Sequence, residues 1–113
     1  MTDITPSLQQ PDILDETVKQ IIKDFNMVDI ALHSFPKVVS YQELFTAVFP
    51  HIEKLLNDNC DKFHALMYRI DISESQIKKT FEQTQDQSFS HVITDMILKR
   101  EVQKVVLRKT FSK

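Results

Sequence analysis

Apolar residues return every three or four positions through most of the chain, which is the period of an amphipathic helix. The first such stretch follows Pro11 and carries Leu14, Val18, Ile21, Ile22, Phe25 and Val28, with charged residues between them. This pattern predicts a first helix that follows Pro11–Asp12 and ends between Asn26 and Leu32. The preceding residues 1–10 are polar and are expected to form a flexible tail.

A second helix is predicted from residue 41. Ser40 and Glu43 have the spacing of a capping box, and Val39 and Leu44 stand where a hydrophobic staple would close. The apolar stripe that follows consists of Leu44, Val48, Ile52, Leu55 and Leu56. Pro50 lies inside this run and has no backbone N–H to donate. We therefore predict that this helix is kinked or broken at Pro50.

The stretch from Asp58 to Phe81 predicts two short helices joined by a corner at residues 71–72. Asp58 can cap the first helix, and Ser73 with Gln76 forms a second capping box that starts the next one. We expect the corner to be held by Tyr68, Arg69, Asp71, Ser73 and Gln76. Within this set, Arg69 is expected to pair with an acidic neighbour, the candidates being Asp71, Asp95 and Glu101.

The same corner can also be interpreted as a helix-turn-helix that binds DNA. Its second helix would be the segment ESQIKKTFEQ, in which two lysines are balanced by two glutamates. Such a helix attracts phosphate groups only weakly. A plain helical corner is therefore the favoured interpretation.

The last predicted helix begins after Ser88 and runs to about Thr110. Its first half has one apolar face, made by Phe89, Val92, Ile93, Met96 and Ile97. In its second half the apolar residues move to roughly the opposite side of the helix, where they are Leu98, Val102, Val105 and Val106. Two interpretations remain open. Either the chain itself buries both faces, or the second stripe binds a protein partner or a second copy of the chain as a homodimer.

In the second interpretation a basic rim would flank the apolar anchors, and it would consist of Arg100, Lys104, Arg108 and Lys109. The segment from Lys99 onward has a net charge of +5, and the first 98 residues have −7. Basic residues near the end of a helix complement its dipole, which is the structural explanation. The functional alternative is a tail that binds the phosphates of a nucleic acid.

The amino-acid composition excludes several glycine-dependent functional motifs. The chain has 113 residues and no glycine, so it contains neither a P-loop nor a dinucleotide-binding fingerprint nor a nucleophile elbow. Turns that need a positive φ must then use Asn or Asp. The single cysteine, Cys60, forms no intramolecular disulfide. The chain shows neither a signal peptide nor a span long enough for a bilayer, so we expect a cytoplasmic protein that makes no membrane contact.

Candidate catalytic and metal-binding residues are few. Cys60 and His64 are four positions apart and could face one metal ion on a helix, but two ligands are too few for a site. The sequence contains no group to orient them as a catalytic pair. We therefore predict that the protein is not an enzyme, has no catalytic or metal site and uses no cofactor or small-molecule substrate.

Two segments, LMYRIDISESQIKK and ITDMILKREVQK, resemble a family of small bacterial proteins of unknown function. The shared pattern is two apolar residues followed by Tyr-Arg-Ile-Asp, then an apolar residue, Ser or Pro, and Glu. A helix rich in Ile and Leu that ends Arg-Glu-x-Gln-Lys comes later. The resemblance implies an all-helical fold and brings no activity, substrate or catalytic residue with it. It draws attention to Tyr68, Arg69, Asp71, Glu74, Arg100, Glu101 and Lys104.

The sequence thus predicts one all-α domain over residues 11–113, a compact bundle of about five helices. The predicted function is that of a non-enzymatic protein–protein interaction or structural module that docks through its C-terminal helix. The alternative is a nucleic-acid-binding protein that uses this basic helix or the corner at residues 58–83.

Overall fold

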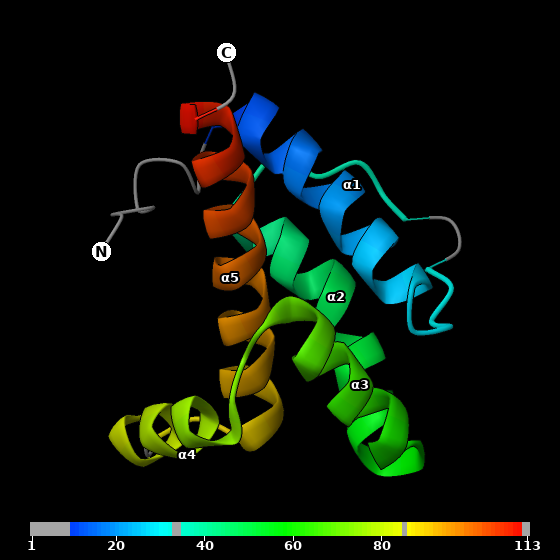
Figure 1. Ribbon diagram of the computed structural model, residues 1–113, viewed down its shortest axis with the longest axis vertical. Coiled ribbons are helices and arrows are strands. Elements are labelled where there is room, and N and C mark those ends of the chain that lie inside the picture. The colour runs from blue at the N-terminus through cyan, green and yellow to red at the C-terminus, as the bar shows by residue number, and fades with distance from the viewer. Residues whose placement is uncertain (1–9, 33–34, 85, 112–113) are drawn as a thin grey trace.

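The computed structural model describes residues 10–32, 35–84 and 86–111 (Figure 1). The predicted tail lies outside the described residues except for Gln10. Within the described part there are five α-helices and no strands. They are α1 (Pro11–Asn26), α2 (Tyr41–Asp58), α3 (Cys60–Ile70), α4 (Glu74–Gln83) and α5 (Phe89–Phe111). The predicted all-α bundle of about five helices is confirmed.

Local capping signals set most of the helix starts. The Ser73 hydroxyl accepts from the backbone N–H of Gln76, and the Gln76 side chain accepts from that of Ser73, so this capping box is complete. Ser40 caps α2 as expected, but the Glu43 carboxylate accepts the N–H of Val39 instead of Ser40. Val39 is 57% exposed, and its neighbour Val38 is the buried residue. The staple predicted for Val39 is therefore wrong.

Two predictions about the α2–α3 region also need correction. Of the kink or break predicted at Pro50, the break is wrong, because α2 continues through this residue to Asp58, and the kink stays a prediction. Asp58 does not cap α3, because α2 extends over it and leaves Asn59 alone between the two helices. The side chain of Asn59 accepts from the N–H of Lys62 and takes the capping role.

Aspartate replaces glycine where the backbone turns with a positive φ. Asp29 follows the end of α1 with φ 63°, and Asp71 ends α3 with φ 70°. Asn and Asp tolerate this left-handed conformation better than other residues that carry a side chain. These are the positive-φ residues of the described part, and they confirm the expectation for a chain without glycine.

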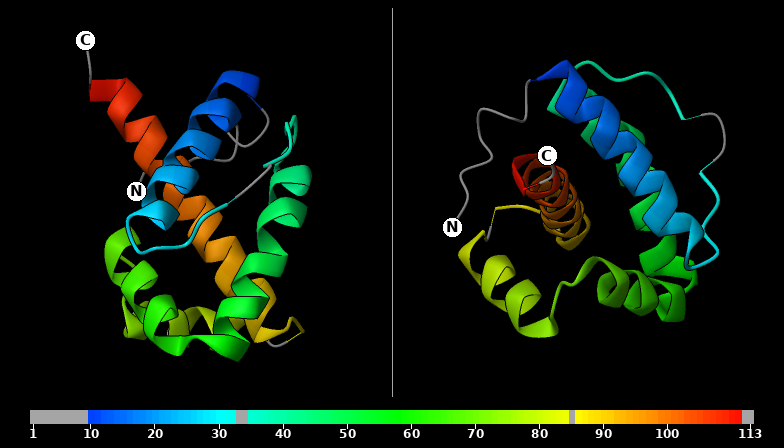
Figure 2. Two further views of the ribbon diagram at one scale, coloured as in Figure 1. Left: turned by 90° about the vertical axis from the view of Figure 1, so that its right-hand side faces the viewer. Right: turned by 45° about the horizontal axis from the view of Figure 1, so that its top comes forward.

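Helix α5 lies at the centre of the molecule and packs against all four other helices. The right-hand view of Figure 2 looks nearly along α5 and shows the other helices around much of its circumference. Its first half contributes Ile93, Ile97 and Leu98 to the main core. Its second half forms a smaller cluster with Ile13 of α1, in which Val102 and Val105 are fully buried. The chain itself therefore covers both apolar faces of α5.

Candidate functional site

The predicted partner surface on α5 is not an exposed surface. Its three apolar anchors Leu98, Val102 and Val105 are fully buried by the chain, and Val106 is half-buried against the Ile13 cluster. The prediction that these residues dock a partner is therefore wrong for the folded chain. Sequence periodicity shows that both faces of this helix are apolar, and α1 supplies the cover for the second face.

Most of the predicted basic rim is engaged inside the molecule. Arg100 donates to the carbonyl of Ile70 at 3.3 Å and pairs with Asp71 at 3.3 Å, so it links α5 to the end of α3. Arg108 donates to Gln20 of α1 at 2.7 Å. Lys109 is exposed. These contacts hold α5 to its neighbours and leave little of the rim free for a partner.

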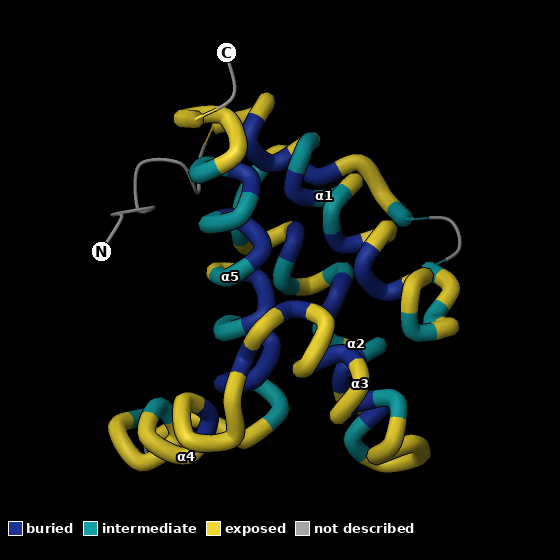
Figure 3. The backbone as a smooth tube through the Cα atoms, viewed as in Figure 1, coloured by how far each residue is buried: buried dark blue, intermediate teal, exposed yellow. Residues whose placement is uncertain are grey.

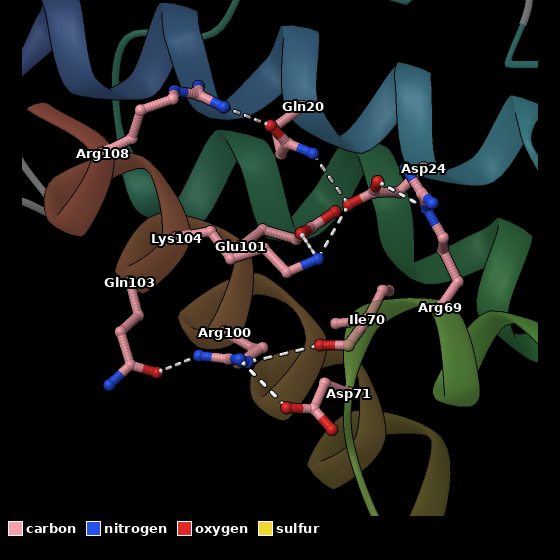
Figure 4. A network of polar contacts seen from close by, with 10 residues as sticks. All are labelled: Gln20, Asp24, Arg69, Ile70, Asp71, Arg100, Glu101, Gln103, Lys104 and Arg108. Carbon is pink, nitrogen blue, oxygen red and sulfur yellow. Dashed lines mark hydrogen bonds and ion pairs between the residues drawn. The ribbon is translucent and has the colours of Figure 1, made fainter. Parts of the chain in front are cut away.

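A buried polar network joins α1, α3 and α5 around Asp24 (Figure 4). Asp24 is fully buried. One of its carboxylate oxygens accepts from Arg69 Nε at 3.1 Å, and the other accepts from Lys104 Nζ at 3.2 Å and Gln20 Nε2 at 3.1 Å. Arg69 thus pairs with a residue of α1, and its predicted pairing with Asp71, Asp95 or Glu101 is wrong. The partner lies 45 positions away in sequence, beyond the reach of local reasoning.

Glu101 lies beside this network and is also fully buried. Figure 4 shows its carboxyl group pointing toward that of Asp24. Lys104 Nζ lies 3.4 Å from Glu101 Oε1 and forms an ion pair with it. Burial, followed by the hydrogen bond and charge of Asp24, raises the pKa of Glu101 to about 8 against a partial opposing effect of Lys104.

The pKa of Asp24 moves the other way. Burial alone would raise this pKa, but hydrogen bonds from a protonated Glu101, from Gln20 and from Lys104, together with the charge of Lys104, lower it below its usual value. The two acids therefore share one proton near neutral pH, with Glu101 neutral and Asp24 ionised. Both carboxyl groups are fully buried, so the pair lies inside the fold and not on its surface.

The structure of the corner between α3 and α4 agrees with the prediction for some of the residues named and differs for others. Asp71 ends α3 in the left-handed conformation and pairs with Arg100, and Ser73 with Gln76 starts α4. Tyr68 does not take part in the packing, because its side chain is 89% exposed. The prediction that Tyr68 helps to hold the corner is therefore wrong.

An apolar groove lies where α3 and α4 diverge from this corner and meet the start of α5. Its apolar residues are Phe63, Met67, Ile72, Ile77, Phe81 and Phe89. We call it the α3–α4 groove. It has a volume of about 370 Å³ and is open to solvent along one side. Phe81 and Phe89 meet edge to face and remain 38% and 39% exposed.

The groove exists because α4 is only lightly packed. Ile77 is the buried residue of this helix, and α4 rests mainly on α5. Figure 3 shows α4 as a largely exposed helix that projects from the lower end of the molecule. The signal that could have revealed the groove is the scarcity of apolar residues in α4, which lets one of its sides stay uncovered.

Another shallow cleft brings together Tyr41 and Phe45 of α2 with His91 and Asp95 of α5. The Tyr41 hydroxyl donates to Asp95, which also pairs with Lys99 at 2.9 Å. Burial, then the hydrogen bond to Asp95 and the charge of Asp95, raises the pKa of Tyr41. A tyrosine whose pKa is raised stays protonated and is a poor general base. These contacts attach α2 to α5, and sequence reasoning had not paired these residues.

The candidate metal ligands Cys60 and His64 are not joined by further metal-ligating side chains of the described residues. Cys60 and His64 are both exposed at the start of α3. Among residues 10–32, 35–84 and 86–111 there is no cluster of three His, Cys, Asp or Glu side chains that could hold a metal ion. Over the same residues, none of the helices combines the length and apolar character needed to cross a bilayer.

Comparison of the chain with protein-family models, with curated proteins and with solved structures gives no match. The resemblance to the bacterial family remains a prediction.

Proposed function

We propose that the chain is a non-enzymatic protein–protein interaction module that binds its partner in the α3–α4 groove. The observation that supports this proposal is the groove itself: five apolar residues from three helices, together with Ile72 of the corner, line a space of about 370 Å³ that opens to solvent. Contiguous apolar surface costs solubility, so an uncovered apolar groove marks a binding site more often than a scattered exposed residue does.

The location differs from the one expected from sequence, and burial gives the reason. The apolar stripe on the second half of α5 is covered by α1, whereas Phe81 and Phe89 are more than one-third exposed. Aromatic side chains of this kind supply much of the binding energy at protein interfaces. The groove therefore replaces the C-terminal helix as the docking surface.

The charges give no support to the nucleic-acid alternative. Arg100, Lys104 and Arg108 face acidic or amide groups of α1, α3 and α5 at 2.7–3.4 Å. Side chains held in this way are less available to neutralise phosphates. On α4, the lysines Lys78 and Lys79 stand beside Glu74 and Glu82, which lowers the attraction of the predicted recognition helix for DNA.

Site-specific photocrosslinking tests the proposal. We would place the photoreactive residue benzoylphenylalanine at Phe81 in the groove and, as the control, at Phe111. Phe111 is an 80% exposed phenylalanine at the opposite end of the molecule. In cells of the source organism, a defined protein adduct should form from position 81 and not from position 111. Adding Lys78→Glu, on the groove rim, should weaken this adduct.

The outcome that would overturn the proposal is equally concrete. If positions 81 and 111 give the same adducts, or if neither gives a protein adduct, the groove is not the docking surface. Phe81 is partly exposed, so the large substituent should be tolerated. Circular dichroism of the purified variants checks that both remain helical.

A further inference from the structure

We propose that the occupant of the α3–α4 groove is an amphipathic helix that lies along α4, with a positive, a negative and a positive side chain at four-residue intervals beside its apolar stripe. This step rests on the proposed function and names the chemistry of the partner. Three features of the groove support it: the charges on its rim, the spacing of its apolar residues and the position of its polar groups.

The rim on α4 carries an alternating row of charges. Glu74, Lys78 and Glu82 all line the groove and are exposed. They are spaced four residues apart, which places them on one side of the helix about one turn from each other. The row therefore spans about 12 Å, or two turns. Across the part of the chain that the structure describes, none of these three side chains is in an ion pair.

The apolar residues repeat at the same interval on both walls. Ile77 and Phe81 are four residues apart on α4, and Phe63 and Met67 are four apart on α3. Helices that bind in grooves present anchors at i, i+3 or i+4, and i+7. A helix with this pattern would place successive apolar side chains between the two walls while its flanking charges meet the α4 rim. This is the arrangement of charged positions beside the seam of a coiled coil.

A small apolar molecule fits these features less well. Small-molecule sites fix their ligand with a few precisely placed polar groups inside the pocket. In the α3–α4 groove the polar lining residues are His64, Glu74, Lys78 and Glu82, and all four side chains belong to exposed residues. The polar groups therefore follow the edge of the groove, where they can contact the flanks of a helix.

A second copy of the chain is also a poor occupant. The order Glu-Lys-Glu reads the same in both directions. If two copies aligned their α4 helices over all three positions, each charge would meet a like charge in either orientation, which destabilises the contact. The charge row consequently favours a partner of different sequence, and it does not set the direction in which that partner runs.

Two synthetic peptides of about 15 residues test the inference, a length at which a designed helix can form in water. Both carry the same leucines at i, i+4 and i+7. One has Lys, Glu and Lys at the flanking positions, and the other has Glu, Lys and Glu. Titration into the full chain, followed by isothermal calorimetry and amide NMR shifts, should show about tenfold tighter binding of the first peptide, since three exposed pairs change from repulsive to attractive.

A charge-reversed protein supplies the decisive comparison. The triple variant Glu74→Lys, Lys78→Glu and Glu82→Lys should prefer the second peptide by a similar factor. The matched control is Lys79→Glu, which reverses an exposed charge on α4 that does not line the groove and should leave the original preference intact. Circular dichroism should confirm that all variants are equally helical.

Several results would overturn the inference. These are equal affinity for the two peptides, an unchanged preference in the triple variant, and absence of binding by both peptides. If these occur while position 81 still gives a protein adduct, the groove binds a protein that is not a helix of this kind, and the proposed function stands. If the adduct is a covalent dimer of this chain, the occupant is a second copy. If the first peptide binds in the groove but no adduct forms in cells, the recognition chemistry is right and the proposed cellular function is wrong.

Discussion

Replacing Glu101 with glutamine should remove a fall in stability that the wild-type protein undergoes between pH 6 and pH 8. The folded protein holds the Glu101 proton with a pKa of about 8, and the ordinary value is 4.5. Between these two values the folded chain binds more protons than the unfolded chain. The free energy of unfolding therefore decreases as the pH rises.

The magnitude follows from proton linkage. Each pH unit inside this window is worth about 1.4 kcal/mol for one proton, and the slope flattens as the pH approaches the folded pKa. From pH 6 to pH 8, the Glu101 proton should account for a loss of about 2 kcal/mol. Asp24 adds nothing over this range, because its pKa is lowered from 3.8 and both its folded and unfolded forms are ionised. Glutamine keeps the size of a neutral Glu101 and cannot ionise.

Urea denaturation at pH 6, 7 and 8 measures the effect. The free energy of unfolding of wild type minus that of Glu101→Gln should become more negative by about 2 kcal/mol across the series. The control is Glu82→Gln, which removes an exposed carboxylate and should run parallel to wild type. Groups that titrate identically in wild type and variant cancel in the difference.

A pH-independent difference between wild type and Glu101→Gln would refute this reasoning. It would mean that Glu101 is already ionised at pH 6 in the folded protein, with Lys104 on α5 and Arg69 on α3 compensating two buried negative charges. In that case Glu101→Gln should also be clearly destabilising at pH 6, because a buried cation would lose its partner. The same titration therefore distinguishes the two protonation states.

Two further substitutions test the fold. Ser73→Ala should lower the free energy of unfolding by about 1 kcal/mol through loss of the capping box, measured by urea denaturation against Ser75→Ala, and no difference between the two would place the start of α4 elsewhere. Val102→Glu should unfold the chain, because it puts a charge into the fully buried Ile13 cluster, and the surface control Lys109→Glu should not. Circular dichroism and size-exclusion chromatography measure the outcome. A folded, monomeric Val102→Glu protein would contradict the burial of α5.

Features that depend on a few adjacent residues could be predicted from the sequence. The Ser73–Gln76 box, the start of α2 after Ser40 and the use of aspartate at positive φ all follow from local hydrogen bonding or backbone sterics. Two local predictions nevertheless failed. Pro50 is accommodated inside α2, and Asn59 replaces Asp58 as the cap of α3 because α2 extends further than its apolar stripe indicated.

Features that depend on which surfaces meet could not be predicted in the same way. The two apolar stripes of α5 were recognised, but the same pattern fits burial by the chain and burial by a partner. The contact with Ile13 decides between them, and it joins segments about 90 residues apart. The α3–α4 groove is the reverse case. Ile77 and Phe81 repeat at helical spacing on α4, but periodicity carries no information about whether another helix covers that face.

The charge asymmetry of the chain connects these observations. An acidic first part and a basic end suggested a phosphate-binding tail, yet the cations of α5 meet acids of α1 and α3 within the fold: Lys104 binds Asp24 across 80 positions and Arg100 binds Asp71. These opposite charges thus help to hold α5 against its neighbours, and Lys104 and Arg100 are paired within the fold. Helix α4 contributes no residue to this network among the described side chains and projects from it. Within the described residues, its Glu74, Lys78 and Glu82 are in no ion pair, so in the proposed mode of binding these charges are available to a partner.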